Sequence, residues 1–328
     1  MTTATMSDFA QNVEKQFGEL VIEHYFNKEP FVYSSGLSST ISDTRKLFPD
    51  RKNMFDRLFE DNISQESLAE EQKLFPPSNY NNLVKLVRLI ETEKSTETLQ
   101  DDLQQNCLIY YLLLDANQEA ADAYASEILL PEAYQHFMNG CYALDRGDMH
   151  KAVEEITYPG TASTYPDAVV QALNAQAVAQ KKRNEGDVLI VRYFDDNTPR
   201  CDMHESMTIY IACLARLDPM TALTYIRSLT HGAQSGAFEC LVKACVEERY
   251  LGGVWRLGNL PFTQREGDLL QQALDAMSPD EDLNNDILVT RALHLGQVRK
   301  AKSLINLAVA KRGGEEKWGE YEATLALY

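Results

Sequence analysis

FMNGCYALDRGDMHKA, residues 137–152, has the pattern of a helix that ends at a glycine and is followed at once by a second helix. Gly147 can take the left-handed backbone that closes a helix, because it has no Cβ atom to clash with the preceding turn. Asp148 can then accept hydrogen bonds from the free N–H groups of the next helix. The stretch therefore predicts a helical hairpin, with Leu144, Gly147 and Asp148 as its structural motif.

A looser copy of this hairpin lies far downstream at ALHLGQVRKA, residues 292–301, and keeps five of the ten residues of 143–152. Two further relatives turn at Asp115–Asn117 and at Asp218–Pro219, where aspartate can cap a helix and proline suits its first position. Hairpins that repeat without a strict period indicate an irregular α-solenoid, in which each pair buries its apolar face against its neighbours. Chance similarity within an ordinary helical domain is the alternative.

The fold class predicted for the chain is all-α: an irregular α-solenoid of helical hairpins, preceded by an N-terminal helix and an extended arm. Residues 1–30 contain apolar side chains at helical spacing and predict an amphipathic helix. Residues 31–78 predict a polar and aromatic arm with short helices, and the part from Pro30 to Asp50, rich in Ser, Thr and Gly, is expected to be a loop. Residues 79–328 predict the solenoid.

The run DVLIVRYF, residues 187–194, has the composition of a β-strand. A lone strand would have no partner elsewhere in the chain, and a buried helix of a solenoid can have the same composition. Both structures stay open at this point.

The charge balance limits the kinds of partner. With 31 basic and 49 acidic residues the formal net charge is -18, so the field of the protein repels phosphate backbones and anionic lipid surfaces. We therefore expect no direct nucleic-acid binding, and a basic partner surface fits the chain better than an acidic one. Because no stretch approaches the roughly 18 apolar residues of a membrane span, we also expect no membrane insertion.

The six cysteines are widely spread and form no CxxC pair, a pattern typical of buried free thiols in a reducing compartment, the nucleus or cytosol. The nearest approach to a metal site is Cys201 with His204, which lacks a second ligand pair. The acidic pairs Asp101–Asp102 and Asp195–Asp196 raise the possibility of an all-helical enzyme with a magnesium site. No carboxylate follows either pair at the spacing of a DDxxD arrangement, so we predict no catalytic residue, no metal ligand and no cofactor.

From residue 137 to 173 the sequence resembles the ELYS-like domain of fungal and animal nucleoporins. The matching pieces are ALDRGD at 143–148, Ala152, the ITYP end of the hairpin at 156–159, and the YPD start of the next helix at 165–167. Weaker similarity extends the resemblance over residues 100–310. Tyr142 departs from the pattern, because family members commonly have tryptophan there, and Met149 replaces an expected aromatic residue.

The resemblance implies a compact fungal-type ELYS protein, a structural subunit of the Y-shaped scaffold complex of the nuclear pore, located at the nuclear envelope. Its expected partners are the large scaffold nucleoporins near the short arm of that complex, and the free chain is expected to be monomeric. Animal relatives also bring chromatin to the assembling pore, an activity that the acidic charge of this chain does not favour. A helical-repeat adaptor of another large assembly is the second function considered, and an all-helical enzyme is the third.

Two segments are candidate partner-binding sites. One is the aromatic arm, with Phe31, Tyr33, Phe48, Phe55 and Phe59, since aromatic side chains contribute much of the binding energy at interfaces. In the favoured alternative, the apolar residues from Phe48 to Phe59 pack onto the chain's own solenoid. If the arm does bind a partner, replacing Phe55 and Phe59 by alanine should weaken association and leave folding unchanged.

The second candidate is the loop expected from Asp195 to Cys201, which begins with the acids Asp195 and Asp196. Asp145 is a further one, because it lies in the last turn of a helix, where the helix dipole disfavours an acid by about 0.3–1 kcal/mol. We expect a compensating cation nearby. It would come either from this chain, such as Arg146 or a residue of the next hairpin, or from a partner subunit.

Overall fold

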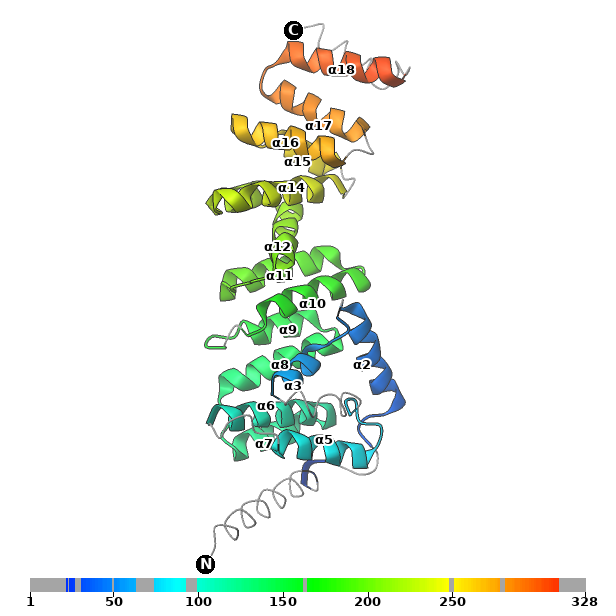
Figure 1. The fold of residues 1–328 in the computed structure, drawn as a ribbon, viewed down its shortest axis with the longest axis vertical. Helices are drawn as coiled ribbons and strands as arrows, with labels where there is room; N and C mark the ends of the chain where they lie inside the picture. Colours follow the sequence, from blue (N-terminus) through cyan, green and yellow to red (C-terminus); the bar gives the residue numbers. More distant parts are fainter. Residues whose placement is uncertain are drawn as a thin grey trace, which may run out of the picture. The chain divides into compact units, whose positions relative to one another are not determined.

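The computed structural model describes residues 22, 24–26, 31–48, 50–62, 74–92, 99–161, 164–247, 251–277 and 281–312. Within these residues every regular element is an α-helix and none is a β-strand (Figure 1). The predicted all-α class is therefore confirmed. The first amphipathic helix was predicted largely from Phe9, Val13, Phe17 and Leu20, which lie outside the described residues.

The chain divides into two compact units, residues 1–200 and 201–328. The helices of the first unit are α2 (Ser35–Leu47), α3 (Met54–Asn62), α5 (Tyr80–Thr92), α6 (Leu99–Ala116), α7 (Gln118–Glu127), α8 (Glu132–Arg146), α9 (Met149–Ile156), α10 (Pro166–Ala179) and α11 (Arg183–Asn197). Those of the second are α12 (His204–Leu217), α13 (Pro219–Ser228), α14 (His231–Glu247), α15 (Leu251–Gly258), α16 (Gln264–Met277), α17 (Glu281–His294) and α18 (Val298–Arg312). The predicted domain boundaries at residues 30 and 78 stay a prediction; the described arm helices α2 and α3 belong to the first unit.

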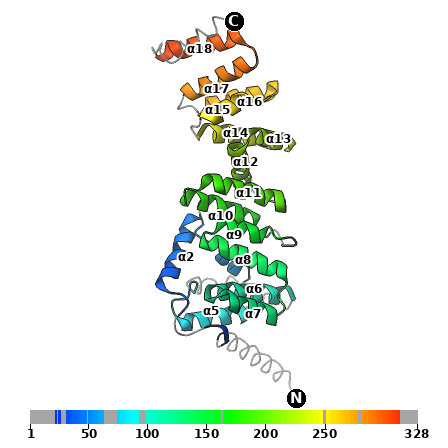
Figure 2. The same cartoon turned by 180° about the vertical axis from the view of Figure 1, so that it is seen from behind.

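Helical hairpins are the building block of the first unit. Consecutive helices pack as the pairs α6–α7, α8–α9 and α10–α11, and each pair also contacts a helix of the next: α6 lies against α8, and α9 against α11. Figures 1 and 2 show these helices layered along the unit. This is the arrangement predicted for a solenoid, in which a helix buries its apolar stripe against its neighbours.

The second unit continues the hairpin pattern with less regular pairing. Helix α14 packs on α12 and α16, α15 packs on α17, and α17 pairs with α18. The predicted cap at Asp218 is confirmed, because its carboxylate accepts hydrogen bonds from the backbone N–H groups of Met220 (3.2 Å) and Thr221 (3.1 Å) at the start of α13. Gly296, with φ +67°, lies in the turn between α17 and α18, where the downstream copy of the motif predicts the end of its first helix.

The Ser- and Thr-rich segment after Pro30 is not the predicted loop. Most of it forms α2, whose first turn is capped by the Ser34 hydroxyl, an acceptor for the Leu37 N–H. Ile41 and Thr44 are buried, and the helix lies against α8 and α10, as both views of the chain show (Figures 1 and 2). Residues with weak helix propensity form a helix here because tertiary packing stabilises it.

The run at 187–194 is helical, so the buried helix is the correct one of the two structures that its composition left open. It belongs to α11, and its large apolar side chains Leu189, Ile190, Tyr193 and Phe194 are buried. The helix packs on both α9 and α10. A helix covered on several sides needs apolar residues around much of its circumference, so it is only weakly amphipathic.

Gly140 allows the two helices of the α8–α9 hairpin to pack closely. A Cβ atom at this position would lie 2.3 Å from Ile156 Cγ1 and 3.2 Å from the carbonyl oxygen of Ala152. The first distance is far below van der Waals contact, so any side chain here would push α9 away from α8.

We predict that Gly140→Ala lowers the free energy of unfolding by about 1–3 kcal/mol, because an added methyl group overpacks the hairpin. The matched control is Gly36→Ala on α2, where the nearest neighbour of a new Cβ would be Ser34 Oγ at 3.8 Å. Urea unfolding followed by far-ultraviolet circular dichroism measures both variants. Equal stability of the two variants would contradict the close packing.

Candidate functional site

The motif at the end of α8 adopts the predicted conformation. Gly147 has φ +80° and ψ +13°, and its N–H donates to the carbonyl oxygen of Leu144 at 3.1 Å. The N–H of Asp148 reaches back to Ala143 O at 2.9 Å, and the Asp148 carboxylate accepts from the N–H of Lys151 at 3.1 Å. The glycine stop and the aspartate cap of the second helix are both confirmed.

The last carbonyl groups of α8 are satisfied by side chains from two other helices. Carbonyl oxygens at a helix end lack the N–H donors that a continued helix would supply, so burying them requires donors from elsewhere. The donors come from α2, from α10 and from the residue that follows α10: Thr44 Oγ1 to Asp145 O (3.0 Å), Gln176 Nε2 to Leu144 O, and Gln180 Nε2 to Gly147 O (2.8 Å).

The Asp145 carboxylate is fully buried beneath the start of α3. Its two oxygens accept hydrogen bonds from the backbone N–H groups of Met54 (2.8 Å) and Phe55 (3.0 Å), and the Tyr111 hydroxyl donates a third at 2.6 Å. Burial raises the pKa of Asp145 to about 6, although these three hydrogen bonds act in the opposite direction. The carboxylate therefore caps a helix that lies some ninety residues earlier in the chain.

This arrangement corrects the expectation of a cation beside Asp145. The compensating charge is the partial positive charge at the N-terminus of α3, together with a phenol hydroxyl. Arg146, the predicted internal partner, instead pairs with the buried carboxylate of Asp115 on α6 and lies over the Tyr142 ring at 4.9 Å. Because Asp145 has no exposed surface, it presents nothing to a partner subunit in this structure.

The aromatic arm also packs inward. Tyr33, Phe48, Phe55 and Phe59 are each at most 6% exposed, and Phe31 is half-buried with its ring 5.9 Å from that of Tyr33. The Phe55 ring lies between aromatic neighbours, with centroids at 4.0 Å to Phe75, 5.0 Å to Tyr111 and 5.8 Å to Phe59. The favoured alternative for these rings, packing onto the chain's own helices, is what the structure shows.

The segment from Asp195 to Cys201 is not a loop throughout, because Asp195 and Asp196 lie in the last turn of α11, which ends at Asn197. Both are exposed, and the Asp196 carboxylate accepts from Arg192 Nε at 3.2 Å one helical turn earlier. The adjacent Asn197 fixes this end of the helix, because its side-chain amide donates to the carbonyl oxygen of Ile156 at 3.1 Å. The two acids thus lie on a well-anchored helix end from which they can reach a partner.

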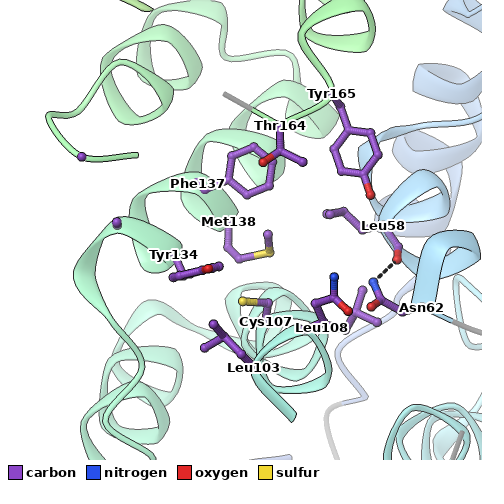
Figure 3. Close-up of a pocket in the computed structure, with 13 residues that line it drawn as sticks. Leu58, Asn62, Leu103, Cys107, Leu108, Tyr134, Phe137, Met138, Thr164 and Tyr165 are labelled. Carbon is purple, nitrogen blue, oxygen red and sulfur yellow. Dashed lines mark hydrogen bonds between the residues drawn. The ribbon is translucent and has the colours of Figure 1, made fainter. Parts of the chain in front are cut away.

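A cavity of about 380 Å³ opens between α3, α6, α8 and the turn before α10. We call it the α3–α6–α8 groove. Figure 3 shows the side chains of Tyr134, Phe137 and Met138 from α8 around it, with Cys107 from α6 and Leu58 from α3. The Cys107 thiol is buried and its pKa is raised to about 12, so it contributes apolar surface and no nucleophile.

Comparison with known proteins identifies the family. A sequence model of ELYS, described as nuclear pore complex assembly, matches residues 52–277. The chain belongs to the ELYS family. The ELYS family is structural and non-enzymatic. Membership of it places this chain at the nuclear pore, in the nucleus. The match begins at Lys52, so it includes α3, which lies well before the residues that carried the sequence resemblance.

A relative with similar length is the Schizosaccharomyces pombe protein named uncharacterized protein ely5. It is 25% identical over 291 residues, which cover 89% of this chain and 90% of the other. Because the similarity covers 89% of this chain, it reaches into both compact units.

Metal and membrane features can be stated for the described part of the chain. There, no group of three or more His, Cys, Asp or Glu side chains could hold a metal ion, and no helix combines the length and apolarity needed to cross a bilayer. All six cysteines are free thiols, four of them buried. The free thiols confirm the pattern predicted from cysteine spacing.

Tyr111, Gln176, Tyr165 and Asn62 also build these sites, and no local sequence pattern indicates their roles. Tyr111 contacts Asp145 across 34 residues, and the Tyr165 hydroxyl donates to Asp61 across 104. Neither pair has a spacing signal, because it joins helices that are neighbours only in the folded chain. The pairing of one buried acid with a helix start could be found only from the structure.

We predict that Asp145→Asn destabilises the protein by about 2 kcal/mol or more. An amide has one acceptor oxygen, so its NH2 group would face a buried donor and leave a hydrogen bond unmade. The matched control is Asp148→Asn, because asparagine caps a helix as well as aspartate does. The urea concentration at the unfolding midpoint should fall for Asp145→Asn and stay unchanged for Asp148→Asn. An unchanged midpoint for Asp145→Asn would exclude the capping role.

Phe55→Ala is predicted to lower stability by about 3–5 kcal/mol, since the ring is fully buried among three aromatic neighbours. This reverses the sequence-based expectation that alanine at 55 and 59 leaves folding intact. Half-buried Phe31 is the comparison site, where alanine should cost much less. Thermal melts of the two variants test the order, and a larger loss for Phe31→Ala would contradict the burial.

Proposed function

We propose that this chain is a structural subunit of the nuclear pore scaffold, docked by protein–protein contacts near the short arm of the Y-shaped complex. The observation that carries the proposal is the ELYS match, which runs from α3 through α16 and so takes in most of the described helices. Its partners are the large scaffold nucleoporins of that arm. The free chain is a monomer.

The architecture supports a scaffolding role. The helical hairpins expose one layer of helix surface after another, and surfaces of this kind suit binding to other macromolecules. The end of α8 ties α2, α3 and α10 to one point, so the first unit is held together as a platform. The net charge of -18 favours a basic partner surface.

Purification of the tagged chain from its own cells, followed by mass spectrometry, tests the proposal. We expect recovery of the Y-complex scaffold subunits, with cross-links to those of the short arm. Recovery of a different large assembly without pore subunits would instead support a general helical-repeat adaptor and contradict the proposal.

Within this proposal, the acidic end of α11 is one docking contact. We predict that the double variant Asp195→Lys, Asp196→Lys weakens binding to purified scaffold complex about tenfold, because like charges would then face a basic partner surface. The matched control reverses the charges of Asp268 and Asp275, which are exposed on α16 and give the same change in net charge. Equal affinity of the two variants would remove α11 from the interface.

A further inference from the structure

The α3–α6–α8 groove has an apolar floor and an open side. Leu58, Cys107, Phe137 and Met138 are buried around it, each at most 6% exposed, whereas Tyr134 at its edge is 38% exposed. Binding clefts of a few hundred Å³ with such linings are typical of sites that take an apolar group. Helices α6 and α8 form two of its walls and pack directly on each other, so the groove is preformed.

A strained residue forms part of the groove wall. Tyr165, immediately before Pro166 at the start of α10, has φ +54° and ψ +45°, a left-handed backbone that bulky side chains rarely adopt. Its hydroxyl donates to the Asp61 carboxylate near the end of α3, which holds the ring at the α3 side of the groove, near Leu58 (Figure 3). Strain of this kind persists where the surrounding structure enforces it, and it is concentrated at binding sites.

The edge of the groove is acidic. Asp61, Asp102 and Glu132 precede the lining residues Asn62, Leu103 and Ala133 in the sequence, and all three acids are exposed. The Asp61 carboxylate contacts the groove wall directly, because it accepts from the hydroxyl of the lining residue Tyr165. Among the described residues that line the groove, none is a lysine or arginine. On the α3 side, Lys52 pairs with Glu60 and Arg57 pairs with Asp50.

We propose that this groove holds a short segment of a partner protein in which an apolar side chain is flanked by lysine or arginine. The apolar anchor fills the cavity and provides most of the affinity, while the basic flanks meet the acidic edge and favour encounter and orientation. Phosphate groups and anionic lipid would be repelled by the same edge. A second copy of this chain, with its own charge of -18, is likewise disfavoured.

This inference rests on the proposed function, because it takes the segment to belong to a scaffold nucleoporin. The probe is a set of overlapping peptides that covers the Y-complex scaffold subunits, each titrated with the full-length chain by fluorescence polarisation. We expect the binders to contain an aromatic or large aliphatic residue with neighbouring Lys or Arg, and their affinity to fall as salt is raised.

Two pairs of variants test the site itself. Ala133→Trp places a bulky ring in the groove, and its control is Ala179→Trp at an exposed position of α10. Asp102→Asn with Glu132→Asn neutralises the edge, and its control is Asp268→Asn with Asp275→Asn on α16. Peptide affinity should fall at least tenfold in Ala133→Trp and several-fold in the neutralised edge, with weaker salt dependence, and stay unchanged in both controls.

Several outcomes would overturn the groove proposal. These are equal peptide affinity of Ala133→Trp and the wild type, binders that are acidic, no bound peptide at all because a segment of this chain fills the groove, or a dimer that Ala133→Trp abolishes. The proposed function is tested separately by recovery of the intact scaffold complex. Full recovery with Ala133→Trp would reject the groove and keep the function, whereas no recovery with the wild type would reject the function.

Discussion

The structure of the first unit depends on one buried carboxylate. Asp145 lies at the negative end of α8 with no exposed surface, a position that is unfavourable for an acid unless donors surround it. The start of α3 and the Tyr111 hydroxyl supply those donors. One side chain thereby satisfies the first N–H groups of α3 and fixes that helix against α6 and α8.

The same end of α8 is a junction for the rest of the unit. Its backbone oxygens accept from Thr44 on α2, from Gln176 on α10 and from Gln180 directly after α10, so helices from the arm and from the following hairpin meet at residues 144–147. The left-handed Gly147 makes this geometry possible by ending α8 where the donors converge. The local motif that predicts a hairpin is thus also the place where the arm is attached.

The helix ends and caps that depend only on local backbone geometry could be predicted from the sequence. Gly147, Asp148 and Asp218 occupy positions where backbone geometry and capping chemistry leave few alternatives, and the structure confirms them. The helix α2 could not be predicted, because its Ser, Thr and Gly residues favour a loop until packing on α8 and α10 stabilises them. The partners of Asp145 and the α3–α6–α8 groove join residues far apart in the chain, so no local pattern reports them.

In the first unit, the residues that stabilise the fold differ from those that are accessible to a partner. Aromatic residues of the arm pack in the core of the first unit, and the groove and the acidic end of α11 are among the accessible features of its described part. Both surfaces are negative or have a negative edge, which fits basic partner segments at each. Membership of the ELYS family assigns this platform to assembly of the nuclear pore.

The attachment of α3 through Asp145 is tested most directly by amide hydrogen exchange at Met54 and Phe55. In the wild type these two amides should be protected as strongly as the interior of α8, and in Asp145→Asn their protection should fall while that of α11 is unchanged. Rapid exchange of both amides in the wild-type protein would contradict the account.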